Sequence, residues 1–254
     1  MTVLFQVSSV VFAYMVVVFL IALAKKDNSV VDVFWGLGFI VIAGFSLWRN
    51  EGIGLHKVLM NLAILIWGLR LSIHIFLRNR GRGEDFRYRT WRDSWKHFLL
   101  RSFFQIFMLQ GLLMVLIAFP VYFVNFSSPL VFSLSGLPGL MIFLFGFAFE
   151  TVGDRQLKVF REDEANKGKI ITTGLWSITR HPNYFGESLV WWGIALFALP
   201  LPGGWTTLVS PLLLMLLLRF VSGVPMLEKK YEGRPDWEEY KKRTAVFVPF
   251  VKFL

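Results

Sequence analysis

Long runs of apolar residues alternate with short charged segments along most of this chain. The apolar runs lie at residues 3–24, 30–48, 55–77, 103–124, 137–152, 184–199 and 206–218. The first four are close to the ~20 residues that an α-helix needs to cross a hydrocarbon core, and the last three are shorter. A shorter run crosses the core only if its polar ends continue as helix. The pattern predicts an all-α, polytopic membrane protein with about seven transmembrane helices.

The connections between these runs are short, which predicts that neighbouring helices are antiparallel. Residues 25–29 and 201–204 are two such connections. We find no internal repeat and no low-complexity tract in the sequence. We therefore expect a single membrane-embedded domain over residues 1–254.

Composition supports a membrane location and removes several kinds of chemistry. Of the 254 residues, 55% are hydrophobic and none is cysteine, which excludes disulfides, thiolate metal sites and cysteine nucleophiles. The net charge of +10 comes from Lys and Arg residues that flank the apolar runs, so it does not indicate nucleic-acid binding. All of these except Arg49, Lys57 and Arg70 fall on one side if seven helices alternate. The positive-inside rule then predicts an outside N-terminus and a cytoplasmic C-terminus.

Ionisable residues occur inside the third run, where contact with lipid would be unfavourable. Arg70, His74 and Arg78 recur every four residues and therefore share one helical face. Asp32 lies near the start of the second run, within expected reach of Arg70. Intramembrane charges normally face a bundle interior or a wet cavity. Two interpretations stay open: a structural Asp32–Arg70 pair that locks two helices, or a substrate pocket in which Asp32, Arg70 or His74 is the catalytic group.

A second stripe of ionisable residues follows the fifth run. Glu150, Asp154, Lys158 and Arg161 share a helical face by their spacing of three and four residues. A solvated helix end explains Lys158, but it does not explain Glu150, which directly follows an apolar stretch. We therefore expect this helix to leave the membrane with a charged face.

Residues 180–187 read R-H-P-N-Y-F-G-E and lead into the sixth run. Pro182 suits the first turn of a helix, because its missing N–H needs no partner there. A helix that starts at this point carries Asn183, Glu187 and Trp191 on one face. Glu187 taken by itself is explained as a polar group near the positive end of the helix dipole.

A helix cap does not require the cationic residues that precede this helix. Arg180 and His181 supply donors for phosphate groups, while an amide, a carboxylate and an indole continue along the helix face. Ribose and carboxamide groups bind such polar side chains, and a planar base stacks on an aromatic ring. The combination favours a nucleotide cofactor.

Polar and aromatic residues follow the seventh run. Glu228 and Tyr231 come first, and the spacing of Trp237 and Tyr240 predicts a short amphipathic helix on the cytoplasmic face. The closing residues 247–253 are rich in aromatic and apolar side chains. This tail is either a membrane-surface anchor or a lid over a cofactor.

The sequence gives no indication of a metal site. Its four histidines, His56, His74, His97 and His181, lack H-x-x-x-H and H-E-x-x-H spacing. It also lacks a G-x-x-x-x-G-K-[ST] phosphate loop and a G-x-G-x-x-G turn after a strand. A nucleotide would therefore be held by the helices themselves and their cytoplasmic loops.

Several of these segments together resemble a known family. Residues 174–187, followed by E228-K-K-Y and the tail from Tyr240 to Phe250, are similar to the C-terminal domain of steroid 5-alpha-reductases. The whole chain resembles the bacterial DUF1295 branch, and N79-R-G-R82 resembles the arginine-rich turn of the reductases. The resemblance implies a seven-helix reductase of the bacterial plasma membrane that binds NADPH from the cytoplasm. Residues 154–254 would contain the cofactor-binding region.

Carried over residue by residue, the resemblance implies two groups of cofactor-binding residues. Those expected around the phosphates and the adenosine are Arg80, Arg82, Asp154, Arg161 and Lys169. Those expected beside the nicotinamide and its ribose are Asn183, Glu187 and Trp191, with Arg180, His181, Tyr184, Glu228 and Tyr231 as further candidates. Arginines suit a 2′-phosphate, which favours NADPH over NADH.

The third run departs from the reductase pattern. Steroid 5-alpha-reductases are expected to polarise the substrate ketone with a glutamate on an early helix and a tyrosine on the third helix, and the third run here has no tyrosine. One of Asp32, Arg70 and His74 would take that role. The expected reaction is hydride transfer from NADPH to a conjugated C=C of a hydrophobic, steroid-, isoprenoid- or lipid-like substrate.

Two other classes of protein share part of this pattern. Isoprenylcysteine and phospholipid methyltransferases carry a similar R-H-P-x-Y-x-G segment and bind S-adenosylmethionine. Glu187 directly after Gly186, together with N79-R-G-R82, favours the reductases. A non-enzymatic transporter or lipid-binding bundle would explain Asp32 and Arg70 but would leave the cytoplasmic motif without a role.

Overall fold

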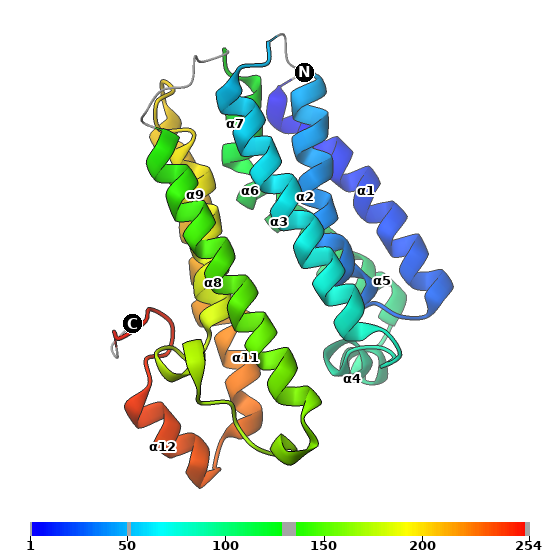
Figure 1. The fold of residues 1–254 in the computed structure, drawn as a ribbon. Helices are drawn as coiled ribbons and strands as arrows, with labels where there is room; N and C mark the ends of the chain where they lie inside the picture. Colours follow the sequence, from blue (N-terminus) through cyan, green and yellow to red (C-terminus); the bar gives the residue numbers. More distant parts are fainter. Residues whose placement is uncertain (1, 50–51, 129–135, 252–254) are drawn as a thin grey trace. The chain divides into compact units, whose positions relative to one another are not determined.

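The computed structural model describes residues 2–49, 52–128 and 136–251. Its described residues form helices and turns without a strand, which confirms the all-α prediction. The chain divides into two compact units (Figure 1). Unit 1 comprises Met1–Leu134 and Ala198–Thr207, and unit 2 comprises Ser135–Phe197 and Leu208–Leu254. The expectation of a single domain over residues 1–254 stays a prediction.

The helices of unit 1 follow the order of the first four apolar runs. They are α1 (Val3–Lys25), α2 (Val30–Trp48), α3 (Leu55–Asn79), α4 (Phe86–Ser94), α5 (Phe98–Ser102), a π-helical stretch (Phe103–Met108), α6 (Leu109–Ile117) and α7 (Phe119–Phe126). The α-helices of unit 2 are α8 (Leu137–Glu162), α9 (Pro182–Leu196), α10 (Val209–Leu216), α11 (Val224–Glu228) and α12 (Pro235–Arg243). Shorter helical stretches are Glu164–Asn166, Gly174–Ser177, Gly204–Leu208, Leu217–Val221 and Lys229–Tyr231.

Six helical segments of the described chain are long and apolar enough to cross a membrane. They are Val3–Lys25, Val30–Trp48, Leu55–Asn79, Phe98–Ile117, Leu137–Glu162 and Gly204–Tyr231. The first three match the predicted runs closely, and the fifth extends well beyond its apolar run, as its charged stripe predicted. The predicted orientation of the chain in the membrane stays a prediction.

The fourth predicted span is wrong in its bounds. It was expected over residues 103–124, whereas the structure has a span at Phe98–Ile117 and a separate helix, α7. The break falls at Ala118, and Pro120 occupies the first turn of α7. Proline cannot donate the backbone hydrogen bond that would continue α6, so the helix ends just before it and a new helix begins.

The sixth predicted span corresponds to α9, which is a short helix. It has 15 residues, or about 22 Å at a rise of ~1.5 Å per residue, against ~30 Å for a hydrocarbon core. Its position in unit 2 depends on α8, against which it packs along its whole length.

Close contact between glycines sets the packing of α2 on α3 in unit 1. A Cβ atom added to Gly36 would lie 2.4 Å from the Gly68 carbonyl oxygen, and one added to Gly68 would lie 2.6 Å from the Gly36 oxygen. Beside this crossing, the rings of Phe39 and Trp67 pack edge to face with centroids 5.6 Å apart, and both side chains are fully buried. Small residues allow backbones to approach this closely in membrane helices.

A similar set of glycines joins α8 to α9 in unit 2. A Cβ atom added to Gly139 would lie 2.8 Å from the Gly193 oxygen, and one added to Gly146 would lie 2.7 Å from the Gly186 oxygen. The pairing order runs in opposite directions along the two helices, so they are antiparallel. The contact with Gly186 matters for function, because it fixes the start of α9 against the charged half of α8.

Lys57, near the start of α3, is buried within unit 1. Its side chain is 1% exposed, and its ammonium donates hydrogen bonds to the carbonyl oxygens of Gly52, Asn125 and Ser127 at 3.2, 3.1 and 2.6 Å. Two of these carbonyls belong to the end of α7, where a cation is favoured by the helix dipole. Lys57 therefore ties the start of α3 to the end of α7.

Candidate functional site

The residues singled out from the sequence are distributed over both units. Unit 1 contains Asp32, Arg70, His74, Arg80 and Arg82. Unit 2 contains Asp154, Arg161, Lys169, Arg180, His181, Asn183, Tyr184, Glu187, Trp191, Glu228 and Tyr231. Each unit therefore has its own candidate site.

The start of α9 is where the sequence predicted it. Pro182 is the first helical residue and His181 is the N-cap. Asn183 and Glu187, one turn apart, are half-buried, and Trp191, a further turn along, is fully buried. The side chain of Asn183 forms no hydrogen bond within the described residues, so its amide can bind a ligand.

The charged stripe of α8 lies directly against this helix start. A Cβ atom added to Gly186 would lie 2.4 Å from the Glu150 backbone nitrogen, and one added to Gly153 would lie 3.2 Å from the Asn183 nitrogen. Glu150 and Asp154 are 2% and 8% exposed. The motif glycine thus allows two buried carboxyl groups on α8 to lie beside the polar first turns of α9.

Arg180, His181 and Glu228 form one compact cluster in unit 2. The Arg180 Nε donates to Glu228 Oε1 at 2.9 Å, and its Nη2 donates to Oε2 at 3.3 Å. The His181 Nε2 lies 2.9 Å from the same Oε1. This is the forked geometry in which arginine and carboxylate bind each other best. The structure therefore brings together three of the residues that were singled out from the sequence.

The protonation state of His181 follows from this environment. Burial lowers the pKa of His181, and the opposing effect of the Glu228 carboxylate does not reverse the shift. The ring is therefore neutral at neutral pH. Because a carboxylate paired with Arg180 can only accept, Nε2 must carry the ring proton and donate it to Glu228. Nδ1 is then an acceptor, and it is buried without a hydrogen-bond partner among the described residues.

Unit 2 also contains a ring that stacks on His181 and two further buried polar atoms that lack hydrogen-bond partners among the described residues. Tyr184 stacks on the His181 ring, with centroids 5.7 Å apart and planes 9° from parallel. The Ser188 Oγ, one turn further along α9, and the Arg219 Nε are both buried without hydrogen-bond partners among the described residues. The Arg219 charge is close enough to contribute to the lowered pKa of His181. Unpaired buried polar atoms are uncommon in folded proteins and often mark a place that a ligand completes.

The C-terminal tail packs on the backbone of the same motif. The Arg180 backbone N–H donates to the Ala245 oxygen at 2.8 Å, and the Arg180 Nη1 donates to the Thr244 oxygen at 2.9 Å. The Thr179 hydroxyl donates to the Phe247 oxygen at 2.7 Å. The motif therefore has a structural role as well as a candidate binding role.

The expected amphipathic helix in the tail is α12, but its aromatic face does not enter the membrane. Trp237 and Tyr240 are 3% and 2% exposed, and the Tyr240 hydroxyl donates to the Trp176 carbonyl. The membrane-anchor interpretation of these two residues is therefore wrong. They are buried in the protein because the tail folds back on the segment before α9. Residues 252–253 of the predicted aromatic end lie outside the described residues.

Three of the expected cofactor residues belong to other segments than the start of α9. Arg161 is exposed near the end of α8, two turns beyond Asp154, and Lys169 is exposed in the following loop. Neither forms an ion pair within the described chain, so both charges are available. Tyr231 instead packs against Trp237, with centroids 5.1 Å apart.

Asp32 in unit 1 is held by residues that sequence reasoning did not identify. The Arg87 Nη2 donates to Asp32 Oδ2 at 2.6 Å, and the Tyr88 hydroxyl donates to Asp32 Oδ1 at 2.6 Å. The Arg87 Nε donates to the Oδ1 of Asp85, the N-cap of α4, at 2.9 Å. Burial, followed by the charge of Asp32, raises the pKa of Tyr88. The expected Asp32–Arg70 pair stays a prediction.

A second ion pair anchors the loop before α4. The Arg92 guanidinium binds Glu84 through two hydrogen bonds of 2.8 and 2.7 Å, and the Asn28 backbone N–H donates to the same carboxylate at 2.9 Å. Burial alone would raise the pKa of Glu84, but the hydrogen bonds from Arg92 and Asn28 outweigh it and lower that pKa. The segment around α4 is thus tied to the loop between α1 and α2 by charge-assisted bonds.

Arg80 and Arg82 lie in the turn that follows α3. Gly81 and Gly83 have φ values of +77° and +71°, a conformation that other residues rarely adopt, so the turn needs its glycines. Both arginines are exposed, and neither forms an ion pair with a described residue. Their charges are therefore available to an anionic partner.

A family model matches most of the sequence. It covers residues 18–244 and is described as protein of unknown function, DUF1295. The chain belongs to the DUF1295 family. The resemblance inferred from the sequence motifs is confirmed at this level.

Three curated proteins are similar to this DUF1295 chain. A probable O-methyltransferase, ustE, of Ustilaginoidea virens is 43% identical over 58 residues, or 23% of this chain and 20% of that protein. An uncharacterized protein of Schizosaccharomyces pombe is 28% identical over 202 residues, or 68% of this chain and 58% of that protein. The protein-S-isoprenylcysteine O-methyltransferase of Saccharomyces cerevisiae is 26% identical over 138 residues, or 50% of this chain and 54% of that protein.

The alignments thus cover from a fifth to somewhat over half of these relatives. No solved structure matches the chain. The helical segments of this DUF1295 chain indicate an integral multi-pass membrane protein.

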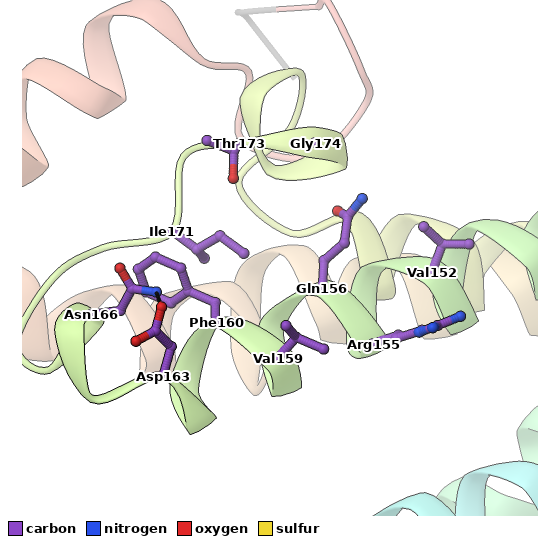
Figure 2. A pocket seen from close by; sticks show the side chains of 10 residues that line it. All are labelled: Val152, Arg155, Gln156, Val159, Phe160, Asp163, Asn166, Ile171, Thr173 and Gly174. Atoms are coloured by element: carbon purple, nitrogen blue, oxygen red, sulfur yellow. Dashed lines mark hydrogen bonds between the residues drawn. The ribbon is translucent and has the colours of Figure 1, made fainter.

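A hollow lies on unit 2, along the C-terminal half of α8 and the loop that follows it (Figure 2). It has a volume of about 520 Å³ and is open to the outside. It is lined by Val152, Arg155, Gln156, Val159, Phe160, Asp163, Asn166, Ile171, Thr173 and Gly174. The predicted site residues lie outside this lining. Within residues 2–49, 52–128 and 136–251, no group of three or more His, Asp and Glu side chains could hold a metal ion.

Proposed function

We propose that this DUF1295 protein is a membrane reductase that binds NADPH on unit 2 and transfers hydride to a conjugated C=C bond of a hydrophobic substrate. The observation that carries the proposal is the start of α9. There an unpartnered amide, Asn183, and a carboxylate, Glu187, lie one turn apart, beside the buried acceptor His181 Nδ1. These groups suit the carboxamide and ribose hydroxyls of a nicotinamide nucleotide.

Exposed cations support a phosphorylated cofactor. Arg161 and Lys169 in unit 2 lack ion-pair partners in the described chain. Arginine is the residue best suited to bind phosphate through paired hydrogen bonds. In this proposal the cofactor supplies the hydride, and the protein binds and orients it and excludes water.

Asp32, Arg70 and His74 in unit 1 remain our candidates for the group that polarises the substrate carbonyl. Arg70 and His74 can donate a hydrogen bond to a carbonyl oxygen, whereas Asp32 accepts from Arg87 and Tyr88 and would act only by fixing such donors in position. We also infer that the N-terminus is outside and the C-terminus is in the cytoplasm of a plasma membrane, on the distribution of Lys and Arg.

A second candidate function is S-adenosylmethionine-dependent methyl transfer. It is favoured by two relatives whose names describe O-methyltransferases. The carboxyl groups of Glu150 and Asp154, buried beside α9, would also suit the positive charge of a sulfonium ligand.

Cofactor binding to the purified protein in detergent separates the two candidates. We expect NADPH to bind with a measurable dissociation constant by isothermal titration calorimetry, and S-adenosylmethionine to give no heat. Binding of S-adenosylmethionine without NADPH would replace the reductase by the methyltransferase. If neither NADPH nor S-adenosylmethionine binds, both candidate functions are contradicted.

The role of the α9 start is tested by Glu187→Gln. We expect this substitution to weaken cofactor binding about tenfold or more, because a hydrogen bond to a charged group contributes ~1.5–3 kcal/mol. Glu239→Gln, at an exposed position of α12, is the matched control and should leave affinity unchanged. If Glu187→Gln lowers only thermal stability, Glu187 is a helix-cap residue and not a ligand.

The orientation can be measured directly because the chain contains no cysteine. Single cysteines at Ser128 and Gly168 lie in exposed positions of two different connections. We expect a membrane-impermeant maleimide to label Ser128→Cys in intact cells and to label Gly168→Cys only after the cells are opened. The reverse pattern would invert the orientation.

A further inference from the structure

The hollow on α8 lies on the side of the helix opposite to the candidate cofactor site. At ~100° per residue, Val152, Gln156 and Val159 point about 140–160° away from the direction of Asp154. Glu150 and Arg161 lie within about 40° of Asp154. A ligand in the hollow therefore contacts a different surface of α8 from the one that packs against α9.

The walls of the hollow are fixed by hydrogen bonds within unit 2. The Gln156 Oε1 accepts from the Leu175 N–H at 3.0 Å, and the Trp176 Nε1 donates to the Gly153 oxygen at 3.1 Å. At the far end, Asp163 accepts from the Ala165 N–H at 2.9 Å and from the Asn166 amide at 3.2 Å (Figure 2). The loop and the helix thus form a preorganised surface.

An apolar stripe leads along α8 to this hollow. Met141, Phe145, Val152 and Val159 follow one another at spacings of four, seven and seven residues, which are about one or two helical turns. Their side chains are 69%, 57%, 43% and 59% exposed, whereas a soluble helix would bury such a stripe. In a membrane protein these side chains face lipid chains.

Arg155 marks the level at which that stripe reaches the lipid headgroups. It lies 18 residues after the start of α8 at Leu137, or about 27 Å along the helix, close to the ~30 Å of a hydrocarbon core. Its side chain is exposed, and it forms no ion pair or side-chain hydrogen bond with a described residue. Figure 2 shows Arg155 and Val152 at one end of the hollow and Asp163 and Asn166 at the other.

Polar groups line the hollow beyond Arg155. Asp163, which accepts hydrogen bonds only from neutral groups, keeps its negative charge at the end of the hollow opposite to Arg155, where it can accept hydrogen bonds from hydroxyl groups. The Asn166 side-chain oxygen and the Thr173 hydroxyl are able to bind hydroxyl groups, while Phe160 and Ile171 supply apolar contact. This lining suits a small polyol that carries a phosphate.

We propose that the hollow binds an anionic phospholipid with a hydroxylated headgroup, such as phosphatidylglycerol. Its phosphate pairs with Arg155, its headgroup hydroxyls bind near Asn166 and Thr173, and its acyl chains follow the stripe from Val152 towards Met141. The occupant comes from the bilayer because the apolar stripe is continuous with the hollow. The site is independent of the cofactor and extends beyond the proposed reductase function.

The test is a titration of the purified protein in detergent with phosphatidylglycerol and, separately, with phosphatidylcholine, followed by microscale thermophoresis. We expect tighter binding of phosphatidylglycerol. Arg155→Gln should weaken it about fivefold, since one basic residue near an anionic lipid contributes ~1 kcal/mol. Val159→Trp, at an exposed position of the lining, should weaken it by filling the hollow.

Lys158→Gln is the matched control, because it removes the same charge from α8 at an exposed position outside the lining. It should leave phosphatidylglycerol binding unchanged. Equal binding of both lipids, or equal loss in Arg155→Gln and Lys158→Gln, would overturn the proposal. NADPH binding is measured separately, so failure of the lipid site and failure of the reductase proposal are distinguishable.

Discussion

The two units contain ion-pair clusters of similar composition that differ in what they leave unpaired. In unit 1, the Asp32 carboxylate accepts hydrogen bonds from the Arg87 guanidinium and the Tyr88 hydroxyl. In unit 2, the Glu228 carboxylate accepts hydrogen bonds from the Arg180 guanidinium and the His181 ring. The tyrosine side chain has one polar atom, the hydroxyl oxygen, and in Tyr88 this hydroxyl donates to Asp32. Histidine has two, and Nδ1 is left buried without a partner among the described residues.

This difference separates a structural cluster from a candidate binding cluster. The Asp32 cluster ties α4 to the start of α2, and its ion pairs satisfy the groups that form them. The Glu228 cluster also ties segments together, but it fixes the tautomer of a histidine whose other nitrogen remains available. Charged residues at a helix end are therefore a weaker indication of a site than a polar atom that the fold leaves without a partner.

The largest expected effect is that of Arg180→Met on unit 2. The substitution removes the Glu228 pair and the bond to the Thr244 oxygen, and it leaves a carboxylate that only a neutral His181 can bind. Breaking a buried pair costs about 3–5 kcal/mol, and the Arg180 side chain is 10% exposed. Thermal unfolding in detergent measures the loss. Limited proteolysis should show new cleavage in residues 232–250, and an unchanged tail would show that the other hydrogen bonds suffice.

Asp32→Asn should have a smaller effect on unit 1. The Arg87 side chain is 29% exposed and retains Asp85, so solvent and the second carboxylate compensate in part. We expect a loss of about 2 kcal/mol, below the range for fully buried pairs. The same unfolding assay measures it, with Asp93→Asn on the exposed side of α4 as the control. If Asp32→Asn lowers stability as much as Arg180→Met does, the greater exposure of the unit 1 ion pair does not reduce its contribution.

Tyr88→Phe isolates the hydroxyl of the unit 1 cluster. Its expected cost is about 1.5 kcal/mol, because a hydrogen bond to a charged group is removed while the ring and the Arg87 pair remain. If Asp32 also acts in catalysis, this variant should change the pH dependence of turnover in addition to stability. A change in stability alone would leave the cluster purely structural.

The smallest expected effect is a pH dependence of stability caused by His181. Burial holds its pKa in the folded protein below the value of about 6.5 that the unfolded chain has, so protons bind preferentially to the unfolded state as the pH falls. We expect stability to be constant above pH ~6.5 and to fall below it by at most ~1.4 kcal/mol per pH unit. His181→Gln should remove this slope, whereas His97→Asn, at an exposed position, should retain it. A slope that persists in His181→Gln would assign the effect to another group.

Local patterns predicted the long helices because their causes are local. The bounds of α1, α2 and α3 follow from apolar length, and the start of α9 follows from Pro182. The fourth span was placed wrongly because its apolar run continues through Pro120, and hydrophobicity alone does not register the missing N–H.

The candidate sites were predicted only in part, because their partners are distant in sequence. Arg87 lies 55 residues after Asp32, and no spacing rule connects them. The signal that was available is the sequence E84-D-F-R-Y88 between two spans, whose two acidic residues, one arginine and two aromatic residues suit an anchored surface helix. Likewise, the amphipathic helix of Trp237 and Tyr240 suggested membrane anchors, and only the fold shows that the Tyr240 hydroxyl donates a hydrogen bond to the Trp176 backbone carbonyl.

The glycine contacts between α8 and α9 have a consequence for how the chain enters its membrane. A 15-residue helix that begins beside charged groups would be poorly retained by the translocon as a single segment. Gly146 and Gly186 let it pair backbone to backbone with the much longer α8. During biosynthesis the two helices would therefore partition into lipid as one hairpin. A substitution at Gly186 would then impair membrane insertion before it impairs ligand binding.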